Sequence, residues 1–241
     1  MKRVTLAGFI IAVLSAQLAP ARWIWAAVGT GYEVEGRVVL LAGGKGQETN
    51  DASRVVEWLA PLDSSEAASR GGRAYEMIQQ DKRFDPELLV VPVGSVVTFP
   101  NLDPWFHNVF SLYRGKRFDL GLYQAGDWKS VRFDRLGPSY IFCNIHPHMA
   151  AVILTIDSNY FGLSDKSGHV TISEVPAGRY RLNVWYQNAD AEALEALARD
   201  VVVDGNRVLP TISINVVLHD LRNHKNKYGQ DYDTGALSPS Y

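Results

Sequence analysis

Residues 140–156, YIFCNIHPHMAAVILTI, carry the most informative pattern in the sequence. It begins and ends with runs of apolar and β-branched residues, which are typical of buried strands. Between the two runs, one short turn carries a thiol, an imidazole and a thioether, from Cys143, His146 and Met149. Each of them alone has an ordinary interpretation, as a small buried residue, a surface group or a core filler. Together, at the end of a strand, they are spaced so that one ion can touch all three.

These side chains discriminate between metals. A thioether is not a normal zinc ligand, whereas soft sulfur combined with imidazole suits copper. Two histidines, one cysteine and a long axial methionine are the ligands of a blue-copper site. His107 supplies the second histidine, at the start of an expected strand that follows the irregular loop 101–106. In a β-sandwich such a position can lie at the same end as the loop that bears Cys143.

Strand patterns surround these residues. Short runs rich in Val, Ile, Tyr and Phe alternate with Gly, Pro, Asn and Asp, which punctuate strands. The runs in the central part of the chain are 75–78, 88–91, 96–99, 107–113, 128–133, 140–142 and 152–156. This density predicts an all-β fold with a Greek-key sandwich over residues 72–157.

Further strand patterns flank the central block. We expect residues 32–60 and 161–218 to form a second, small β-sandwich domain with one short helix that Asp190 caps. The central block is then an insertion in this domain. The alternative is that the early strands belong to the central sandwich. The polar stretch 219–241 has no periodicity, which predicts a mobile tail.

The N-terminus has the layout of a secretory signal peptide. A positive start and an apolar run over residues 4–14 precede a small-x-small site at 19–21. Because the run is shorter than the roughly 20 residues of a spanning helix, we expect the segment 1–27 to be removed, by cleavage after Ala21 or near Ala27. This predicts a periplasmic or otherwise exported protein. Only a retained signal segment would attach it to a membrane.

Composition excludes several functions. The net charge is −2 at pH 7, and no basic stripe is present to neutralise phosphates, so no nucleic-acid partner is expected. The one cysteine, Cys143, cannot form an internal disulfide in an exported chain, and metal ligation accounts for it. Six histidines, with a single His-x-His pair, are too few for the trinuclear cluster of a multicopper oxidase. We therefore expect an electron-transfer protein rather than an enzyme.

On these residues, the region 72–157 resembles a cupredoxin domain of the amicyanin and plastocyanin type. The matching features are Phe84-x-Pro86, Val93-Gly94 ahead of Val97-x-Phe99, His107-Asn108 and a short Cys-x-x-His-x-x-Met loop. The resemblance implies one type 1 copper per chain, with His107, Cys143 and His146 as equatorial ligands and Met149 as the axial ligand. It also implies that Asn108 ties the two ligand loops together by hydrogen bonding.

The flanking region is similar to transthyretin-like modules related to carboxypeptidase regulatory domains. The similarity rests on the turn motifs Asp165-x-x-Gly168 and Val175-Pro176-Ala177-Gly178-x-Tyr180. The whole arrangement looks like the methylamine-utilisation-type cupredoxin proteins of bacteria. These resemblances imply a periplasmic location and the transfer of single electrons.

The resemblance also implies a surface for a partner. His146 would reach toward solvent through an apolar patch that includes Pro147, with Pro104 and Trp105 as further contributors, and a transient redox protein would dock there. Hydrophobic residues around the cysteine sulfur tune the redox potential of such a site. The candidates for this dry shell are Phe106, Phe142 and Ile145.

Two other functions stay open. The first is a copper storage or delivery protein, in which His148 and Met77 are additional donors. The second is an interaction module with a vestigial metal site, in which case Cys143→Ala would leave the biological role intact. A blue oxidised form with reversible one-electron reduction separates the electron carrier from the delivery protein.

Overall fold

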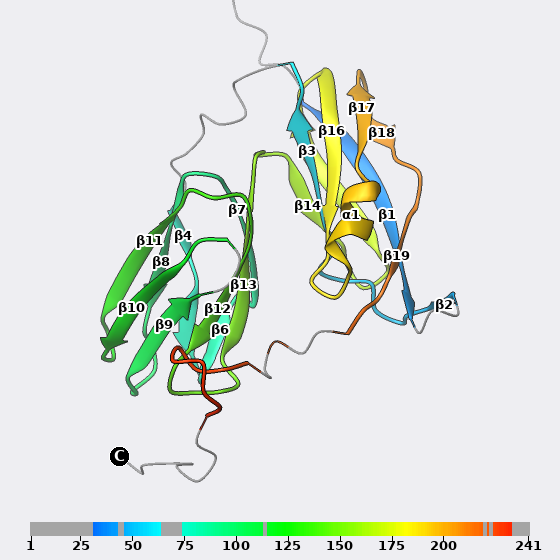
Figure 1. Cartoon of the computed structure of the whole chain (residues 1–241). Helices are drawn as coiled ribbons and strands as arrows, with labels where there is room; N and C mark the ends of the chain where they lie inside the picture. Colours follow the sequence, from blue (N-terminus) through cyan, green and yellow to red (C-terminus); the bar gives the residue numbers. More distant parts are fainter. Residues whose placement is uncertain are drawn as a thin grey trace, which may run out of the picture.

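The computed structural model describes residues 31–42, 46–63, 74–112, 115–218, 221 and 224–232. The segment 1–27, predicted to be a signal peptide, lies outside the described residues. Regular structure is nearly all β strand with one short helix, which confirms the predicted all-β fold (Figure 1). Within the described ranges, no helix is long and apolar enough to cross a membrane.

The central sandwich, residues 74–156, consists of two sheets and a hairpin. The larger sheet has the order β10-β9-β12-β13-β7, with the bounds Phe118–Tyr123, His107–Ser111, Gly137–Cys143, Ala150–Ile156 and Leu88–Pro92. The smaller sheet has the order β11-β8-β4, with the bounds Trp128–Phe133, Ser95–Pro100 and Ala74–Glu76. The hairpin pairs β5 (Ile78–Gln80) with β6 (Arg83–Asp85).

Along the strands of the central sandwich, every second side chain points into the core. In β8, Ser95, Val97 and Phe99 are buried and the residues between them are partly exposed, as in a strand with one face on the core. Cys143 and Met149 belong to the same buried cluster as Val97 and Phe99. Each large apolar side chain buried in this way stabilises the fold by about 1.5–3 kcal/mol. The end of β12 is therefore part of a rigid frame.

The flanking sandwich combines strands from both ends of the chain. In one sheet, β1 (Tyr32–Ala42) pairs with β2 (Gln47–Glu48), β15 (His169–Val175), β18 (Arg207–Val208) and β19 (Ile212–Asn215). The other sheet has the order β14-β3-β16-β17, with the bounds Phe161–Leu163, Val56–Pro61, Gly178–Trp185 and Arg199–Val203. The helix α1 (Ala191–Ala196) begins after Asp190, whose carboxylate accepts the N–H of Ala193 at 3.0 Å, as the sequence predicts.

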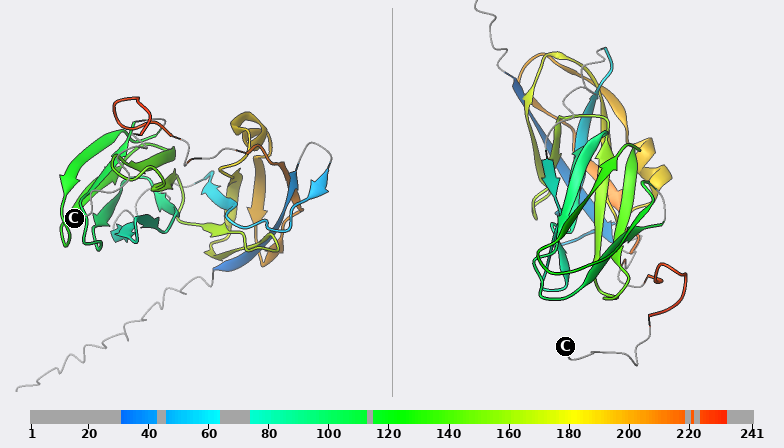
Figure 2. Two further views of the ribbon diagram at one scale, coloured as in Figure 1. Left: turned by 90° about the horizontal axis from the view of Figure 1, so that it is seen from below. Right: turned by 90° about the vertical axis from the view of Figure 1, so that its left-hand side faces the viewer.

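The two sandwiches lie side by side and share an apolar contact (Figures 1 and 2). Its buried members, from β3, β7 and β13, are Val56, Val90, Leu154 and Ile156. At its edge, Trp58 Nε1 donates to Asp157 Oδ1 at 2.9 Å and Arg54 forms an ion pair with Glu87 at 2.8 Å. The two sandwiches are therefore joined by packed side chains as well as by the chain itself.

Residues 219–241 were expected to form a mobile tail. Of these residues, 224–232 lie beside the end of β12 in the central sandwich (Figure 1). Polar and aromatic side chains make these contacts, so no apolar periodicity marks them in the sequence.

Candidate metal centre

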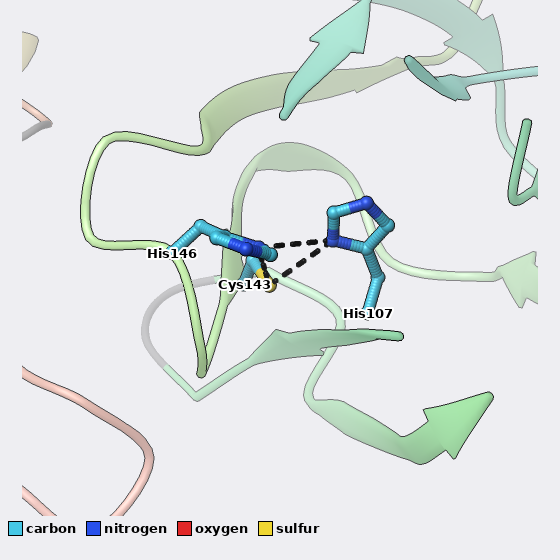
Figure 3. A group of neighbouring side chains, drawn as sticks. All are labelled: His107, Cys143 and His146. Atoms are coloured by element: carbon cyan, nitrogen blue, oxygen red, sulfur yellow. Dashed lines mark hydrogen bonds between the residues drawn. The ribbon is translucent and has the colours of Figure 1, made fainter. Parts of the chain in front are cut away.

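Three of the predicted ligands come together at one end of the central sandwich. His107 is the first residue of β9 and Cys143 is the last residue of β12. These strands are neighbours, and Cys143 is paired with Val109. His146 lies in the loop from β12 to β13. Figure 3 shows the side chains of His107, Cys143 and His146 directed toward one another.

The donor atoms are spaced for one ion. Cys143 Sγ lies 3.7 Å from Nδ1 of His107 and 3.7 Å from Nδ1 of His146, and the two Nδ1 atoms are 3.1 Å apart. Bonds from zinc to nitrogen and sulfur are about 2.0 and 2.3 Å long. An ion of that size fits between donors at these separations. His107, Cys143 and His146 are, within the described part of the chain, the one group of His, Cys, Asp or Glu that is arranged to hold a metal.

Burial keeps both histidines neutral. His107 is fully buried and His146 is partly buried. Burial lowers the pKa of His107, and it lowers the pKa of His146 to about 4, with a further contribution from the nearby His107. At pH 7 both rings therefore carry a lone pair that is available to a metal.

Cys143 is a thiol at neutral pH in the metal-free protein. Burial raises its pKa, and hydrogen bonds from the backbone N–H groups of Asn108, Ile145 and His146 act in the opposite direction. When a metal replaces the proton, the same N–H groups stabilise the negative sulfur. The sulfur therefore sits in a preformed site for a thiolate ligand.

Asp103 orients His107, and sequence reasoning missed it. Its Oδ2 accepts the Nε2–H of His107 at 2.8 Å, and the side chain of Asp103 is 6% exposed. This bond leaves Nδ1, the atom that faces Cys143, without a proton and free to bind a metal. In the sequence only its position marks it, in the loop 101–106 four residues ahead of His107.

The hairpin β5–β6 holds Asp103 in place. The backbone N–H groups of Asp81 and Lys82 donate to its two carboxylate oxygens at 2.7 and 2.9 Å. Both turn residues have a φ of 54°, as in a type I′ hairpin turn. Burial by itself raises the pKa of Asp103, but hydrogen bonds from Lys82, His107 and Asp81 outweigh it, so that the pKa lies below its usual value. The carboxylate next to His107 is ionised at pH 7.

Met149 lies next to Cys143. It is fully buried in the same cluster, and the N–H of Cys143 donates to the carbonyl of Met149 at 3.2 Å. The N–H of Met149 donates to the carbonyl of His146 at 3.1 Å, which closes the loop. Of the proposed additional donors, His148 is exposed and stands outside the convergent group, and Met77 is buried in the core.

Asn108 connects the strands through its main chain. Its backbone N–H is bonded to the sulfur of Cys143, which links β9 to β12. Its side-chain amide donates to Asp119 Oδ1 at 2.7 Å and so links β9 to β10. The backbone of Asn108 thus links the two ligand-bearing strands, and its side chain contacts the neighbouring strand.

The three residues predicted to form a dry shell separate into two groups. Phe142 is 2% exposed and belongs to the interior. Phe106 and Ile145 are 57% and 42% exposed, so each of the two ligand-bearing loops presents an apolar side chain to solvent. His146 lies in the same loop as Ile145 and is partly exposed beside it.

No protein-family profile matches the sequence. No curated protein matches it either. The solved structures to which the chain is similar include copper proteins. A purple cupredoxin from Nitrosopumilus maritimus is 24% identical, with 34% of this chain and 99% of that chain covered and a TM-score of 0.31. A reduced amicyanin mutant is 21% identical, with coverages of 42% and 98% and a TM-score of 0.33.

A third similar structure is a copper-containing nitrite reductase from Thermus scotoductus SA-01. It is 21% identical, with a TM-score of 0.34 over 40% of this chain. The chain spans 25% of the length of that reductase.

Proposed function

We propose that this chain is a mononuclear type 1, or blue, copper protein that carries single electrons between redox partners. The observation that carries the proposal is the convergence of one cysteine sulfur and two histidine Nδ1 atoms at the end of a rigid sandwich. These three donors are the strong ligands of a blue-copper site.

The donor set fits copper better than zinc. Structural zinc sites are closed by four nitrogen, sulfur or oxygen ligands. Among the described residues, no fourth His, Cys, Asp or Glu joins the group. A type 1 copper needs only a weak fourth ligand, and Met149 is buried next to Cys143. In the proposed site His107, Cys143 and His146 are the equatorial ligands and Met149 is the axial ligand.

The bound copper would supply a one-electron couple, and the chain would hold its ligands still. Asp103 fixes the ring of His107, and backbone N–H groups surround the sulfur of Cys143. Both ligand strands belong to one five-stranded sheet. Ligands that are already in place rearrange little between the two oxidation states, which favours fast electron transfer.

Electrons would enter and leave through His146. It is the more exposed of the two histidines and lies in the loop with Ile145 and Pro147. Together with the exposed Phe106, these residues would supply the apolar surface on which a redox protein docks transiently. A small, apolar contact of this kind allows the partner to leave after each transfer.

The N-terminus supports export of the protein. The segment 1–27 has the charge and hydropathy pattern of a secretory signal. We therefore place the copper protein in the periplasm or outside the cell. Expression with the signal, followed by sequencing of the N-terminus of the exported protein, tests this and identifies the cleavage position.

Copper loading of the exported protein tests the function. We expect one copper per chain, an intense blue colour in the oxidised form and reversible one-electron reduction. Cys143→Ser should abolish the colour, whereas His148→Ala, a change of the exposed histidine in the same loop, should retain colour and redox activity. A colourless protein that binds Cu(I) tightly and passes it to an acceptor would contradict the electron carrier and support a delivery protein.

A further inference from the structure

The C-terminal segment 224–232 contacts the strand end that carries the cysteine. We call this segment the clasp; it is drawn in red in Figure 1. It meets three consecutive residues, Phe142, Cys143 and Asn144, where β12 passes into the ligand loop. The clasp is separated from them by about eighty residues of sequence. Its contacts are thus long-range tertiary interactions.

Two aromatic side chains of the clasp hold the end of β12. The hydroxyl of Tyr232 donates to the backbone carbonyl of Cys143 at 2.7 Å. His224 stacks on Phe142, with ring centroids 4.0 Å apart and an angle of 23° between the rings. Nε2 of His224 lies 2.9 Å from the hydroxyl oxygen of Tyr232, so the two side chains also support each other.

Lys227 joins the clasp to the ligand loop and to β10. Its backbone N–H donates to Asn144 Oδ1 at 3.0 Å, and its ammonium group donates to Asp119 Oδ2 at 2.9 Å. The other carboxylate oxygen of Asp119 accepts from the side chain of Asn108. Asn108 is also the residue whose backbone N–H is bonded to the sulfur of Cys143. Lys227 therefore contacts the ligand loop directly, through Asn144, and Asn108 indirectly, through Asp119.

The clasp is ordered by its own hydrogen bonds. The side-chain oxygen of Asn226 accepts the backbone N–H groups of Tyr228 and Gln230 at 2.9 and 3.0 Å. The N–H of Asn226 donates to the carbonyl of Gln230 at 2.8 Å. Gly229 has a φ of +78°, in the left-handed region that glycine adopts without strain. A segment folded on itself loses less conformational entropy when it docks.

We propose that the clasp is a positioning element of the metal centre and that Tyr232 is its main anchor. This inference rests on the proposed function for its effect on copper. The carbonyl of Cys143 cannot shift without loss of the hydrogen bond from Tyr232. The bond therefore restrains the backbone whose N–H groups surround the sulfur and from which His146 projects. Without the bond the loop moves more freely, and copper is less firmly held.

Tyr232→Phe tests the proposal in the copper-loaded full chain, because it removes one hydroxyl and keeps the ring. We expect copper to pass to a competing Cu(I) chelator about fivefold faster, the effect of one net hydrogen bond, and electron self-exchange to slow. Tyr180→Phe is the matched control, since it also removes a hydroxyl that donates to a backbone carbonyl, that of Pro176 at 2.9 Å, but in the flanking sandwich. Equal rates in the wild type and in both variants would overturn the proposal.

Hydrogen exchange of the metal-free protein separates this inference from the proposed function. The backbone amides of residues 143–146, 148 and 149 should exchange faster in Tyr232→Phe than in Tyr180→Phe or the wild type. Unchanged exchange would refute the clasp. If the wild type binds no copper but Tyr232→Phe still speeds exchange, the proposed function fails while the positioning contact is supported.

Discussion

Replacing Asp103 with asparagine removes one negative charge beside the metal centre and keeps the shape of the side chain. The carboxylate lies 2.8 Å from Nε2 of His107, and the opposite ring nitrogen faces Cys143. The charge therefore lies about 7 Å from the proposed copper. At an effective dielectric constant of about 20, its interaction with the one unit of charge that separates Cu(II) from Cu(I) is roughly 2 kcal/mol. For a one-electron couple, where about 59 mV corresponds to a factor of ten, this is on the order of 100 mV.

The potential should rise in Asp103→Asn, because a negative charge favours Cu(II) over Cu(I). Voltammetry of the copper-loaded variant measures the shift directly. Asp134→Asn is the control: it removes the same charge from a side chain that is 51% exposed, where solvent screens it. A shift no larger than that of the control, or a fall in potential, would refute the role assigned to Asp103.

Three further predictions concern protons and packing. Cu(II) binding at pH 7 should release about one proton, from Cys143, because burial keeps His107 and His146 neutral; calorimetry in buffers of different ionisation enthalpy counts the protons, and a value of about two would contradict this. Burial raises the pKa of Glu57 from 4.5 to about 7. Between these two pH values the folded protein binds more protons than the unfolded protein, so the free energy of unfolding falls as the pH rises. The free energy of unfolding should fall by about 3 kcal/mol over this pH range. Glu57→Gln should abolish this pH dependence in urea unfolding, and an unchanged pH dependence in the variant would show that Glu57 is not its cause. Leu154→Ala, in the contact between the sandwiches, should lower the free energy of unfolding by about 2–5 kcal/mol, and a negligible loss would show that this contact contributes little.

Strands with strong alternation could be predicted from the sequence. The expected strand 128–133 coincides with β11. The strand β10 was missed because Asp119 and Gly121, residues typical of turns, interrupt its pattern. Its register on β9 is irregular between Asp119 and Leu122. Such a strand is stabilised by its pairing with β9 rather than by the β propensity of its own residues.

The site could be predicted where its parts are close in sequence. Cys143 and His146 share one loop, so their convergence follows from local spacing. His107 is distant, and its inclusion depended on the sandwich topology. Asp103 was not found because its role depends on a hairpin turn whose position the sequence does not reveal. The contact of Tyr232 with Cys143 was also missed, since a single hydrogen bond across 89 residues leaves no periodic pattern.

Anomalous diffraction at the copper edge, from crystals of the copper-loaded protein, locates the metal and identifies its ligands. We expect a single copper peak within bonding distance of Cys143 Sγ and of Nδ1 of both His107 and His146. A peak bonded to other residues, or full copper loading with His107 turned away from the metal, would contradict the proposed site.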